Sequence, residues 1–304
     1  MHSLREKDMI KTVKEYLDEL KRELSGSDPA LIQDAVSDAE EHLTNALAGE
    51  MDASPGQAAE EALAPIIEKY GSPSEIASAY REVESRLGPS LAVPRRQGPR
   101  SFLAKYFGIL GEARAWGAFF YMLLSAVTGI VYGAWIFTAA SVSALTLILI
   151  IGIPVTGLFL LSVRGMGLIE GRIVEALLGV RMPRKPIFVD RGLKWTAKLK
   201  LLYTDRQTWK TLLYLFLQMP LGLIYFFLFL ILFTGSLTGI VGTILRIILH
   251  LPFVEARGGG DAVSAWWLPL IFIGGLLLLA GTMHMAKWVG KVHGRYAKAM
   301  LVRN

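Results

Sequence analysis

Three long stretches without a formal charge constrain this chain more than any other feature. Residues 115–163, 211–245 and 262–286 contain no Asp, Glu, Lys or Arg, and they span 49, 35 and 25 residues. A helix needs about 20 mostly apolar residues to cross a hydrocarbon core of ~30 Å. Stretches of this length do not fit a globular core, so the sequence predicts a polytopic α-helical membrane domain.

The start of the chain and its lack of cysteine narrow the class further. Residues 1–20 are charged and amphipathic and lack the apolar core of a signal peptide, so we expect the first hundred residues to lie in the cytosol. The chain has no cysteine, which excludes disulfides, thiolate metal sites and cysteine nucleophiles.

The charge is distributed unevenly along the chain. Residues 1–88 hold 9 Lys and Arg against 19 Asp and Glu, a balance of −10, whereas residues 89–304 hold 23 against 7, a balance of +16. Binding to nucleic acid requires cations that neutralise phosphates. The acidic head, residues 1–88, is therefore not expected to bind DNA, and the basic residues beside the spans are a topology signal first.

The head reads as a cytoplasmic bundle of about four short helices with clear start and stop signals. Gly26 ends the first helix, and Asp28 with Pro29 fits a capping residue followed by proline in the first turn. Ser72, Pro73 and Glu75 fit a capping box, as do Ser54, Pro55 and Gln57. Residues 89–114 form a basic linker to the membrane domain, 115–304.

One group in the head could bind a metal. Asp38, Glu41 and His42 lie at positions i, i+3 and i+4, which places them on one helix face. Metal sites usually recruit ligands from several elements, and no second His-rich helix is visible. A solvated polar face is the favoured interpretation, and no cofactor motif appears elsewhere.

The segments EYLDEL at 15–20, DAEEHL at 38–43 and YGSPSEIASAY at 70–80 resemble the HAAS domain. This small helical domain occurs in bacterial membrane-associated signalling proteins. The resemblance covers roughly residues 8–85. It implies a cytosolic regulatory partner, either a PadR-like transcriptional regulator or a separate kinase.

The membrane region contains an internal repeat. The segment WGAFFYMLLSAVTGIVY at 116–132 matches WKTLLYLFLQMPLGLIY at 209–225 at an offset of 93, and RGMGLIEGRIVEALL at 164–178 matches KWVGKVHGRYAKAML at 287–301 at an offset of 123. Repeat one covers 112–178 and repeat two covers 205–301. The paired positions that we expect to have structural or interface roles are Trp116 with Trp209, Tyr121 with Tyr214, Gly129 with Gly222, and Arg172 with Arg295.

The repeat predicts the architecture. Each copy is a helical hairpin followed by an amphipathic juxtamembrane helix, and the spans are expected at about 116–138, 142–163, 211–233 and 266–286, with a tight turn at 138–143. Both copies have the same order, which indicates a parallel repeat. The two offsets differ by 30 residues, which places an insertion at 235–264 in the second copy. The fold class is all-α.

The distribution of basic residues gives an orientation. The linker 89–114 holds 5 basic residues and 1 acidic, segment 164–210 holds 11 and 4, and the tail 287–304 holds 5 and none, whereas the insertion holds 2 and 2. The positive-inside rule then places both termini on the cytoplasmic side of a bacterial inner membrane. The insertion is apolar enough to be a fifth span. An interfacial helix with Arg246 and His250 on its polar side preserves the repeat and is favoured.

The stretch 147–180, the start of the second copy at TDRQTWKTLLYLFLQMPLGL and the closing HGRYAKAMLV resemble the "sensor" membrane domain that precedes the kinase in some bacterial, especially actinobacterial, histidine kinases. The resemblance covers roughly 101–304. The sequence has no kinase module after it, so autophosphorylation is not carried over.

No catalytic motif supports an enzyme. The chain has no phosphate-binding glycine loop with Lys-Ser/Thr, no HExxH and no GxSxG, and His293 is matched by Glu170 in the first copy, which argues against a phosphoacceptor. A transporter is expected to place ionisable or coordinating groups near the bilayer midplane, and the expected spans offer no carboxylate or Arg.

The sequence thus favours a membrane-embedded sensing or regulatory protein that relays a cue through its acidic head. A permease-like subunit for a lipid or apolar molecule stays the alternative, and a homo-oligomer is left open. We also expect that the head could dock on a basic segment of the same chain, and the candidate docking residues are Arg181, Arg184, Lys185, Arg191, Lys194, Lys198 and Lys200.

Overall fold

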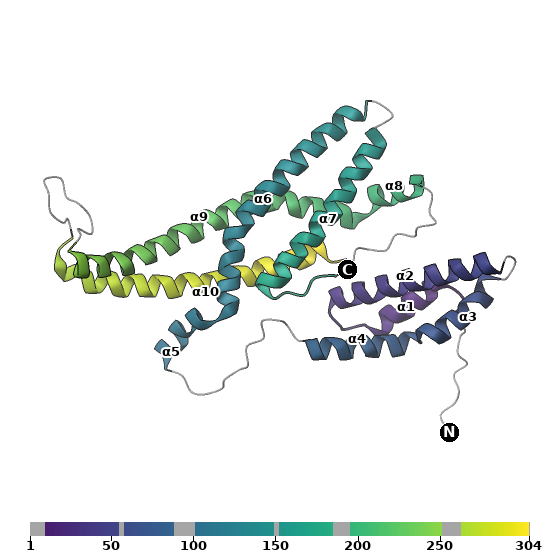
Figure 1. Cartoon of the computed structure of the whole chain (residues 1–304), viewed down its shortest axis with the longest axis horizontal. Helices are drawn as coiled ribbons and strands as arrows, with labels where there is room; N and C mark the ends of the chain where they lie inside the picture. The colour runs from purple at the N-terminus through teal and green to yellow at the C-terminus, as the bar shows by residue number, and fades with distance from the viewer. Residues whose placement is uncertain are drawn as a thin grey trace, which may run out of the picture.

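The computed structural model describes residues 10–54, 58–87, 101–148, 152–184, 195–250 and 263–303. Within these ranges the chain is helical and has no strand, as the sequence predicts. Figure 1 shows the head helices packed together beside two long hairpins. In chain order the elements are α1 (Val13–Glu23), α2 (Pro29–Ala53), α3 (Ala59–Tyr70), α4 (Pro73–Leu87), α5 (Phe102–Phe107), η1 (Gly108–Gly111), α6 (Ala113–Thr146), α7 (Gly152–Leu178), α8 (Trp195–Thr204), α9 (Arg206–Leu249), η2 (Ala265–Trp267) and α10 (Leu268–Leu301).

The head has its own hydrophobic core between α1, α2 and α4. Leu20, Leu24 and Leu43 are fully buried in it. Tyr16 is buried as well, and its hydroxyl donates a hydrogen bond of 2.8 Å to the Gly71 carbonyl, which ties α1 to the turn before α4.

Two of the predicted helix starts in the head are confirmed. The Asp28 side chain accepts a hydrogen bond of 2.9 Å from the Ala30 amide at the start of α2, with Pro29 in the first position. The Ser72 amide donates to Glu75 at 2.8 Å, and the Glu75 amide donates to Ser72 Oγ at 3.4 Å, which is the reciprocal arrangement of a capping box. The third predicted start, at 54–57, lies mostly outside the described residues.

In the part of the chain that the structure describes, four helices are long and apolar enough to cross a membrane, namely α6, α7, α9 and α10. The chain is a multi-pass membrane protein. At 1.5 Å per residue, the 44 residues of α9 extend about 66 Å, more than twice the ~30 Å of a hydrocarbon core. Helix α9 must therefore tilt strongly or extend beyond the hydrocarbon core.

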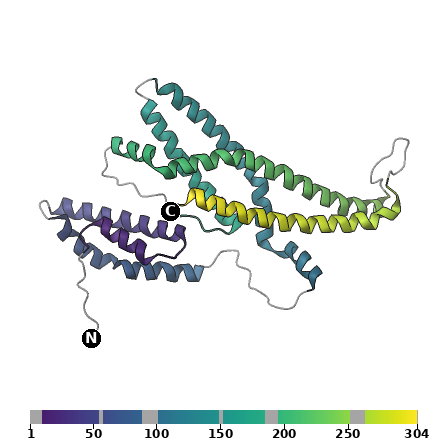
Figure 2. The same cartoon turned by 180° about the vertical axis from the view of Figure 1, so that it is seen from behind.

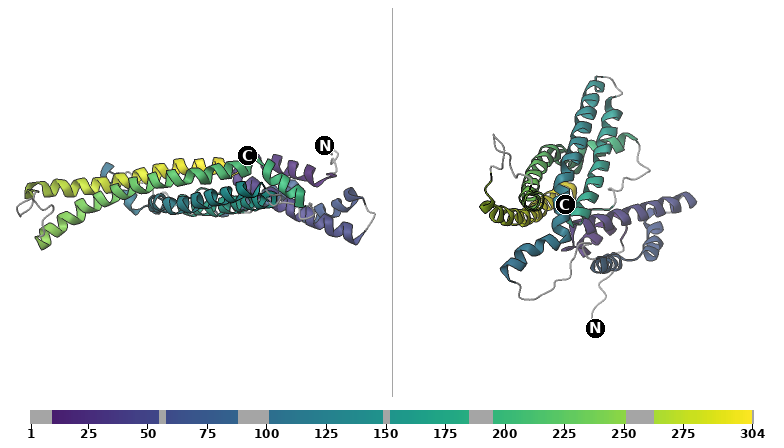
Figure 3. Two further views of the ribbon diagram at one scale, coloured as in Figure 1. Left: turned by 90° about the horizontal axis from the view of Figure 1, so that it is seen from above. Right: turned by 60° about the vertical axis from the view of Figure 1, so that its left-hand side comes forward.

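The hairpins α6–α7 and α9–α10 cross near their bases and diverge toward their tips (Figure 1). The view from behind shows the same crossing, with the C-terminal end of α10 beside the head (Figure 2). Seen from above, the molecule is elongated along α9 and α10 (Figure 3, left). Helix α6 packs along α9 at the crossing.

The two hairpins are equivalent in their helix ends. Helices α6 and α9 begin 93 residues apart, and α7 and α10 end 123 residues apart, which are the two offsets of the sequence repeat. The indole of Trp116 donates to the Leu110 carbonyl at 2.8 Å, and the indole of Trp209 donates to the Tyr203 carbonyl at 2.9 Å. The same hydrogen bond thus occurs at the base of each hairpin.

Contacts between the hairpins are reciprocal. Arg164 of the first hairpin pairs with Asp205 of the second at 2.6 Å, and Lys287 of the second pairs with Glu112 of the first at 2.7 Å. Arg164 and Lys287 are equivalent by the 123 offset, as are Glu112 and Asp205 by the 93 offset. Reciprocal pairs of this kind define a two-fold relation between the copies, as in an isologous dimer interface.

The turn of the first hairpin lies later than predicted. Helix α6 continues through 138–143 to Thr146, and α7 begins at Gly152, so the expected span 142–163 is corrected to 152–178. The segment 138–146 contains no Gly or Pro, and Thr146 Oγ1 bonds back to the Val142 carbonyl at 2.8 Å, which is compatible with a continuing helix. The helix start is at Gly152, two residues before Pro154.

The insertion also differs from the prediction. Residues 235–249 do not form a separate interfacial helix but continue α9, which ends where His250 adopts a positive φ of 53°. A Cβ at Gly239 would lie 3.2 Å from the Ile271 carbonyl, so α9 and α10 approach closely there. Packing against α10 therefore extends the hairpin along the insertion. Residues 251–262 lie outside the described ranges.

The two amphipathic segments after the spans are also not separate helices. Residues 165–178 are the second half of α7, and residues 288–301 are the last part of α10. Gly167, Glu170 and Val174 are buried in α7, as are Gly290 and His293 in α10. These faces therefore pack in the centre of the protein instead of lying along a lipid leaflet.

Candidate functional site

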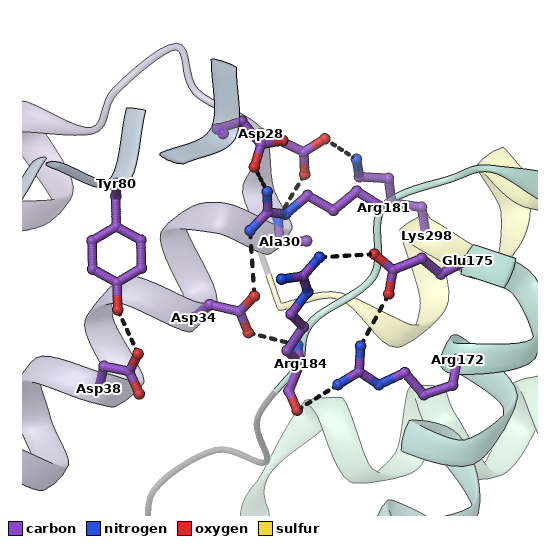
Figure 4. A network of polar contacts seen from close by, with 11 residues as sticks. Asp28, Ala30, Asp34, Asp38, Tyr80, Arg172, Glu175, Arg181, Arg184 and Lys298 are labelled. Carbon is purple, nitrogen blue, oxygen red and sulfur yellow. Dashed lines mark hydrogen bonds and ion pairs between the residues drawn. The ribbon is translucent and has the colours of Figure 1, made fainter. Parts of the chain in front are cut away.

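The first residues of α2 meet the membrane domain, where they form a polar contact region that we call the head seat (Figure 4). The seat consists of Arg181 and Arg184 after α7, Lys298 near the end of α10, and Arg303 after α10. Ala30 of α2 is fully buried and belongs to the hydrophobic core of the membrane domain. The head is thus packed against the hairpins as well as linked to them.

Asp34 of α2 is the centre of the contact with the first hairpin. Its Oδ1 accepts a hydrogen bond of 2.7 Å from the Arg184 amide, and its Oδ2 lies 3.6 Å from the Arg181 guanidinium. The Asp34 side chain is only 8% exposed, and that of Arg181 is 17% exposed. Arg181 also pairs with Glu84 of α4. A carboxylate buried to this degree needs such partners.

The second hairpin contacts the same part of α2. Lys298 pairs with Asp28, whose other oxygen caps α2. The Arg303 amide donates to Gln33 Oε1 at 2.9 Å. The first turns of α2 therefore touch the ends of both copies of the repeat, and a relative movement of the hairpins would break some of these contacts.

Two of the seven residues in the candidate docking segment contact the head, namely Arg181 and Arg184. Lys200 is exposed on α8. Lys185, Arg191 and Lys194, and the side chain of Lys198, lie outside the described residues. Docking of the head on the basic segment as a whole stays a prediction. Arg184 is also held by the first hairpin, because its carbonyl accepts from Arg172 at 3.2 Å.

The metal candidate is not brought together as a ligand set. No cluster of three His, Cys, Asp or Glu side chains suited to a metal occurs among the described residues. The ring of His42 stacks on Tyr70, with centroids 4.5 Å apart. Asp38 accepts a hydrogen bond from the Tyr80 hydroxyl. Burial, together with the bond and charge of Asp38, raises the pKa of Tyr80. Asp38, Glu41 and His42 instead line a groove of about 710 Å³ on the head.

The repeat-paired tyrosines meet at the crossing of the hairpins. The hydroxyls of Tyr121 and Tyr214 are 3.5 Å apart and both side chains are fully buried. Gly129 and Gly222 pack on the opposite helix in the same way, the former against Gln218 and the latter against Ser125. Arg172 pairs with Glu175 at 3.1 Å, whereas its counterpart Arg295 lies exposed on α10.

A buried carboxylate lies between these tyrosines. Glu170 of α7 is fully buried, and its Oε1 accepts from the Tyr121 hydroxyl at 2.7 Å and from the Gln218 amide at 3.3 Å. Its Oε2 accepts from the Tyr132 hydroxyl at 3.1 Å. His293 Nε2 lies 2.8 Å from the Tyr121 hydroxyl. All four membrane helices contribute to this cluster, which ties the hairpins together.

Sequence reasoning missed this cluster, because it expected no ionisable group within the spans and placed Glu170 and His293 outside the bilayer. The signal was available: Glu170 and His293 are a repeat pair, and so are Tyr121 and Tyr214. A two-fold relation brings the members of both pairs near the axis. His293 is 2% exposed, which agrees with the expectation that it is not a phosphoacceptor.

Two family models match the chain in the predicted order. The model named Sensor, described as "Putative sensor", matches residues 121–301, which is 181 of the 304 residues. The HAAS model matches residues 15–79. No curated protein and no solved structure matches the chain. Both families are signalling domains without a catalytic role.

Proposed function

Because this chain belongs to the Sensor family, we propose that it relays a membrane or extracytoplasmic cue to a cytosolic partner through its acidic head. The observation that carries the proposal is the head seat. Asp34 binds the segment after the first hairpin, and Asp28 binds the end of the second. A cue that shifts one hairpin against the other would change the ion pairs between the head and the membrane domain.

The physical basis is electrostatic. The head has a balance of −10, and the seat contributes the cations Arg181, which pairs with Asp34 and Glu84, and Lys298, which pairs with Asp28. The Lys298–Asp28 pair is partly exposed, is worth about 0–1 kcal/mol and is screened by salt, whereas the Arg181–Asp34 pair is more buried and depends more on its geometry. A head held by a few such pairs can be released by a small change in geometry, and release would expose Asp28 and Asp34. A chain with both termini in the cytoplasm would present this head to the cytosol.

The HAAS match supports a regulatory partner of the head. We propose a PadR-like regulator or a separate kinase. A purified candidate of either class should bind the protein more tightly when the seat is weakened, for example in Arg181→Glu. Partner binding that is identical in wild type and Arg181→Glu would contradict a relay through the seat.

Release of the head can be measured directly, because the chain has no cysteine and accepts single-site labels. Spin labels at Glu50→Cys on α2 and Lys200→Cys on α8, both exposed, report the distance between head and membrane domain in nanodiscs. Arg181→Glu should broaden and lengthen the distance distribution, and Asp34→Lys with Glu84→Lys should partly restore it. Lys291→Glu, an equal charge change at an exposed residue of α10, is the matched control. A distribution that Arg181→Glu leaves unchanged would count against the seat.

The buried Glu170 is the observation that favours the transport alternative, since an ionisable group inside a membrane domain is often functional. Its partners argue for a different role, because Tyr121, Tyr132 and Gln218 all donate to it and α6, α7 and α9 close around it. Substrate-dependent flux in proteoliposomes that Glu170→Gln abolishes would favour transport. The proposed relay predicts no such flux.

A further inference from the structure

A cavity of about 330 Å³ lies at the base of the first hairpin. Its walls come from α7, the start of α9 and Leu301 at the end of α10, and Gln33 of the head closes one side. Most of the lining is apolar, and small-molecule sites typically have volumes of ~300–1,000 Å³. The cavity opens past Leu161 and Gly165, which are both exposed, so an apolar molecule could enter from the bilayer.

The cavity belongs to the first copy of the repeat. Gly165 is matched by Trp288 in the second copy at the 123 offset, and Thr208 is matched by Ala115 at the 93 offset. A Cβ at Gly165 would meet no atom of the described residues within 4 Å. The copies agree at their tryptophans and ion pairs, so this difference is local. The second copy carries at this position the indole of Trp288, which is 66% exposed, whereas the first copy carries no side chain there.

The polar end of the cavity is formed by Arg164, whose guanidinium donates to Asp205 at 2.6 Å and to Thr208 at 2.9 Å. Arg303 does not line the cavity, but its charge repels that of Arg164. An anion bound at Arg164 would offset this repulsion and accept a hydrogen bond from the guanidinium.

We propose that this cavity binds an anionic single-chain amphiphile, such as a long-chain carboxylate, with its chain along Leu161 and Leu168 and its head group at Arg164, where the charge of Arg303 also acts. The volume favours one acyl chain over two. Gln33 lines the cavity and accepts a hydrogen bond from the Arg303 amide. Resting on the relay proposed above, the ligand is the cue: it lies against Gln33, shifts Gln33 from the Arg303 amide and so weakens the contact between the head and the membrane domain.

The first test measures binding of a fluorescent long-chain fatty acid to the full-length protein in nanodiscs of zwitterionic lipid. Gly165→Trp places a large side chain at the wall of the cavity and should obstruct it. Because each buried CH₂ is worth about 0.8 kcal/mol, excluding several of them should weaken binding by more than about tenfold. Gly165→Leu, with a smaller side chain, should weaken it less. Gly274→Trp, at an exposed glycine of α10 with open space around it, is the matched control and should bind as wild type.

The second test examines the head group. An alcohol of the same chain length should bind about tenfold more weakly than the carboxylate, and Arg303→Gln should reduce that preference without affecting the alcohol. Equal binding of alcohol and carboxylate would overturn the anionic assignment. Adding anionic phospholipid to the nanodiscs should leave probe binding largely intact. Loss of the probe under that condition would identify a two-chain lipid as the occupant and overturn the single-chain assignment.

These experiments distinguish failure of the cavity proposal from failure of the relay proposal. Probe binding that falls in Gly165→Trp and Gly165→Leu but not in Gly274→Trp supports the cavity, whatever the head labels report. Unchanged binding in both Gly165 variants overturns the cavity, even if the head responds to Arg181→Glu as proposed. In a wild-type protein that binds the probe, unchanged head–membrane distances would contradict the ligand as the cue.

Discussion

Tyr121 and Tyr214, which are 93 residues apart in the chain, place their hydroxyls 3.5 Å from each other at the crossing of the two hairpins. They are equivalent in the repeat but not in their contacts. Tyr121 lies 2.7 Å from Glu170 and 2.8 Å from His293, whereas Tyr214 lies 3.4 Å and 3.1 Å from the same two groups. A two-fold relation between the copies thus surrounds an asymmetric pair, because one partner is a carboxylate and the other an imidazole.

Removing one hydroxyl should therefore cost more than removing the other. Tyr121→Phe removes the shortest hydrogen bonds of Glu170 and His293 and leaves both groups with longer ones, so we expect a loss of about 1–3 kcal/mol in the free energy of unfolding. Tyr214→Phe breaks longer hydrogen bonds and should cost about 0.5–1.5 kcal/mol. Denaturation in mixed micelles compares the two. Equal losses would mean that the cluster does not discriminate between the tyrosines.

The glycines at the crossing should be intolerant of a methyl group. A Cβ at Gly129 would lie 2.6 Å from the Gln218 carbonyl oxygen, and a Cβ at Gly222 would collide with the Ser125 carbonyl. Either Ala variant must push α6 and α9 apart, at a cost of about 1–3 kcal/mol or more.

A glycine without such a neighbour provides the control for these variants. Gly274→Ala occupies open space on α10 and should be neutral or stabilise by up to about 1 kcal/mol, because Ala favours a helix over Gly. Thermal unfolding of Gly129→Ala, Gly222→Ala and Gly274→Ala in the same detergent measures the difference. Similar effects in all three would contradict close packing at the crossing.

The repeat allowed much of this crossing to be predicted. Trp116 with Trp209 and Gly129 with Gly222 were paired from sequence, and each pair makes equivalent contacts. Hydropathy alone misplaced the rest. It assigned the charged segment after Val163 to the membrane surface, although Glu170 is buried between the two hairpins. Burial of that kind depends on how helices cross, which a single segment does not encode.

Only the membrane-domain side of the head seat could be predicted from the sequence. The basic segment after the first hairpin was a candidate because its cations cluster in sequence. Its partners in the head could not be predicted, since the head has 19 acidic residues and only the packed structure selects Asp34 and Glu84. The late end of α6 at Thr146 and the long α9 were missed for a related reason: packing between the helices of a hairpin sets its length, and Ser or Thr residues do not end a helix reliably.

The reciprocal ion pairs should differ in strength although the repeat makes them equivalent. The side chains of Arg164 and Asp205 are 20% and 16% exposed, against 39% and 29% for Lys287 and Glu112. We expect a coupling energy of about 1.5–3 kcal/mol for the first pair, as for hydrogen bonds to charged groups, and about 0.2–1 kcal/mol for the second.

Double-mutant cycles with Arg164→Met and Asp205→Asn, and with Lys287→Met and Glu112→Gln, measure the two coupling energies. Asn is chosen at 205 because Asp205 also caps α9, and an amide oxygen preserves that hydrogen bond. Coupling of the first pair should also persist at high salt, since buried charges are screened less than exposed ones. A larger coupling for Lys287 and Glu112 would reverse the expected order.

Alkaline pH should destabilise the fold of the head through ionisation of Tyr80. Burial, and then the hydrogen bond and charge of Asp38, raise the pKa of the Tyr80 hydroxyl above its ordinary value of 10.0. The folded head therefore favours the neutral phenol, and the resulting stability is fully present below pH 10. It is lost as the pH rises from there through the higher pKa of the folded state, because the unfolded chain releases the proton first. The free energy of unfolding of wild type and Tyr80→Phe can be compared between about pH 8 and 11, a range on both sides of the ordinary tyrosine pKa. It should fall more steeply with pH in wild type. Parallel curves would mean that the Tyr80 hydroxyl titrates as it does in the unfolded chain.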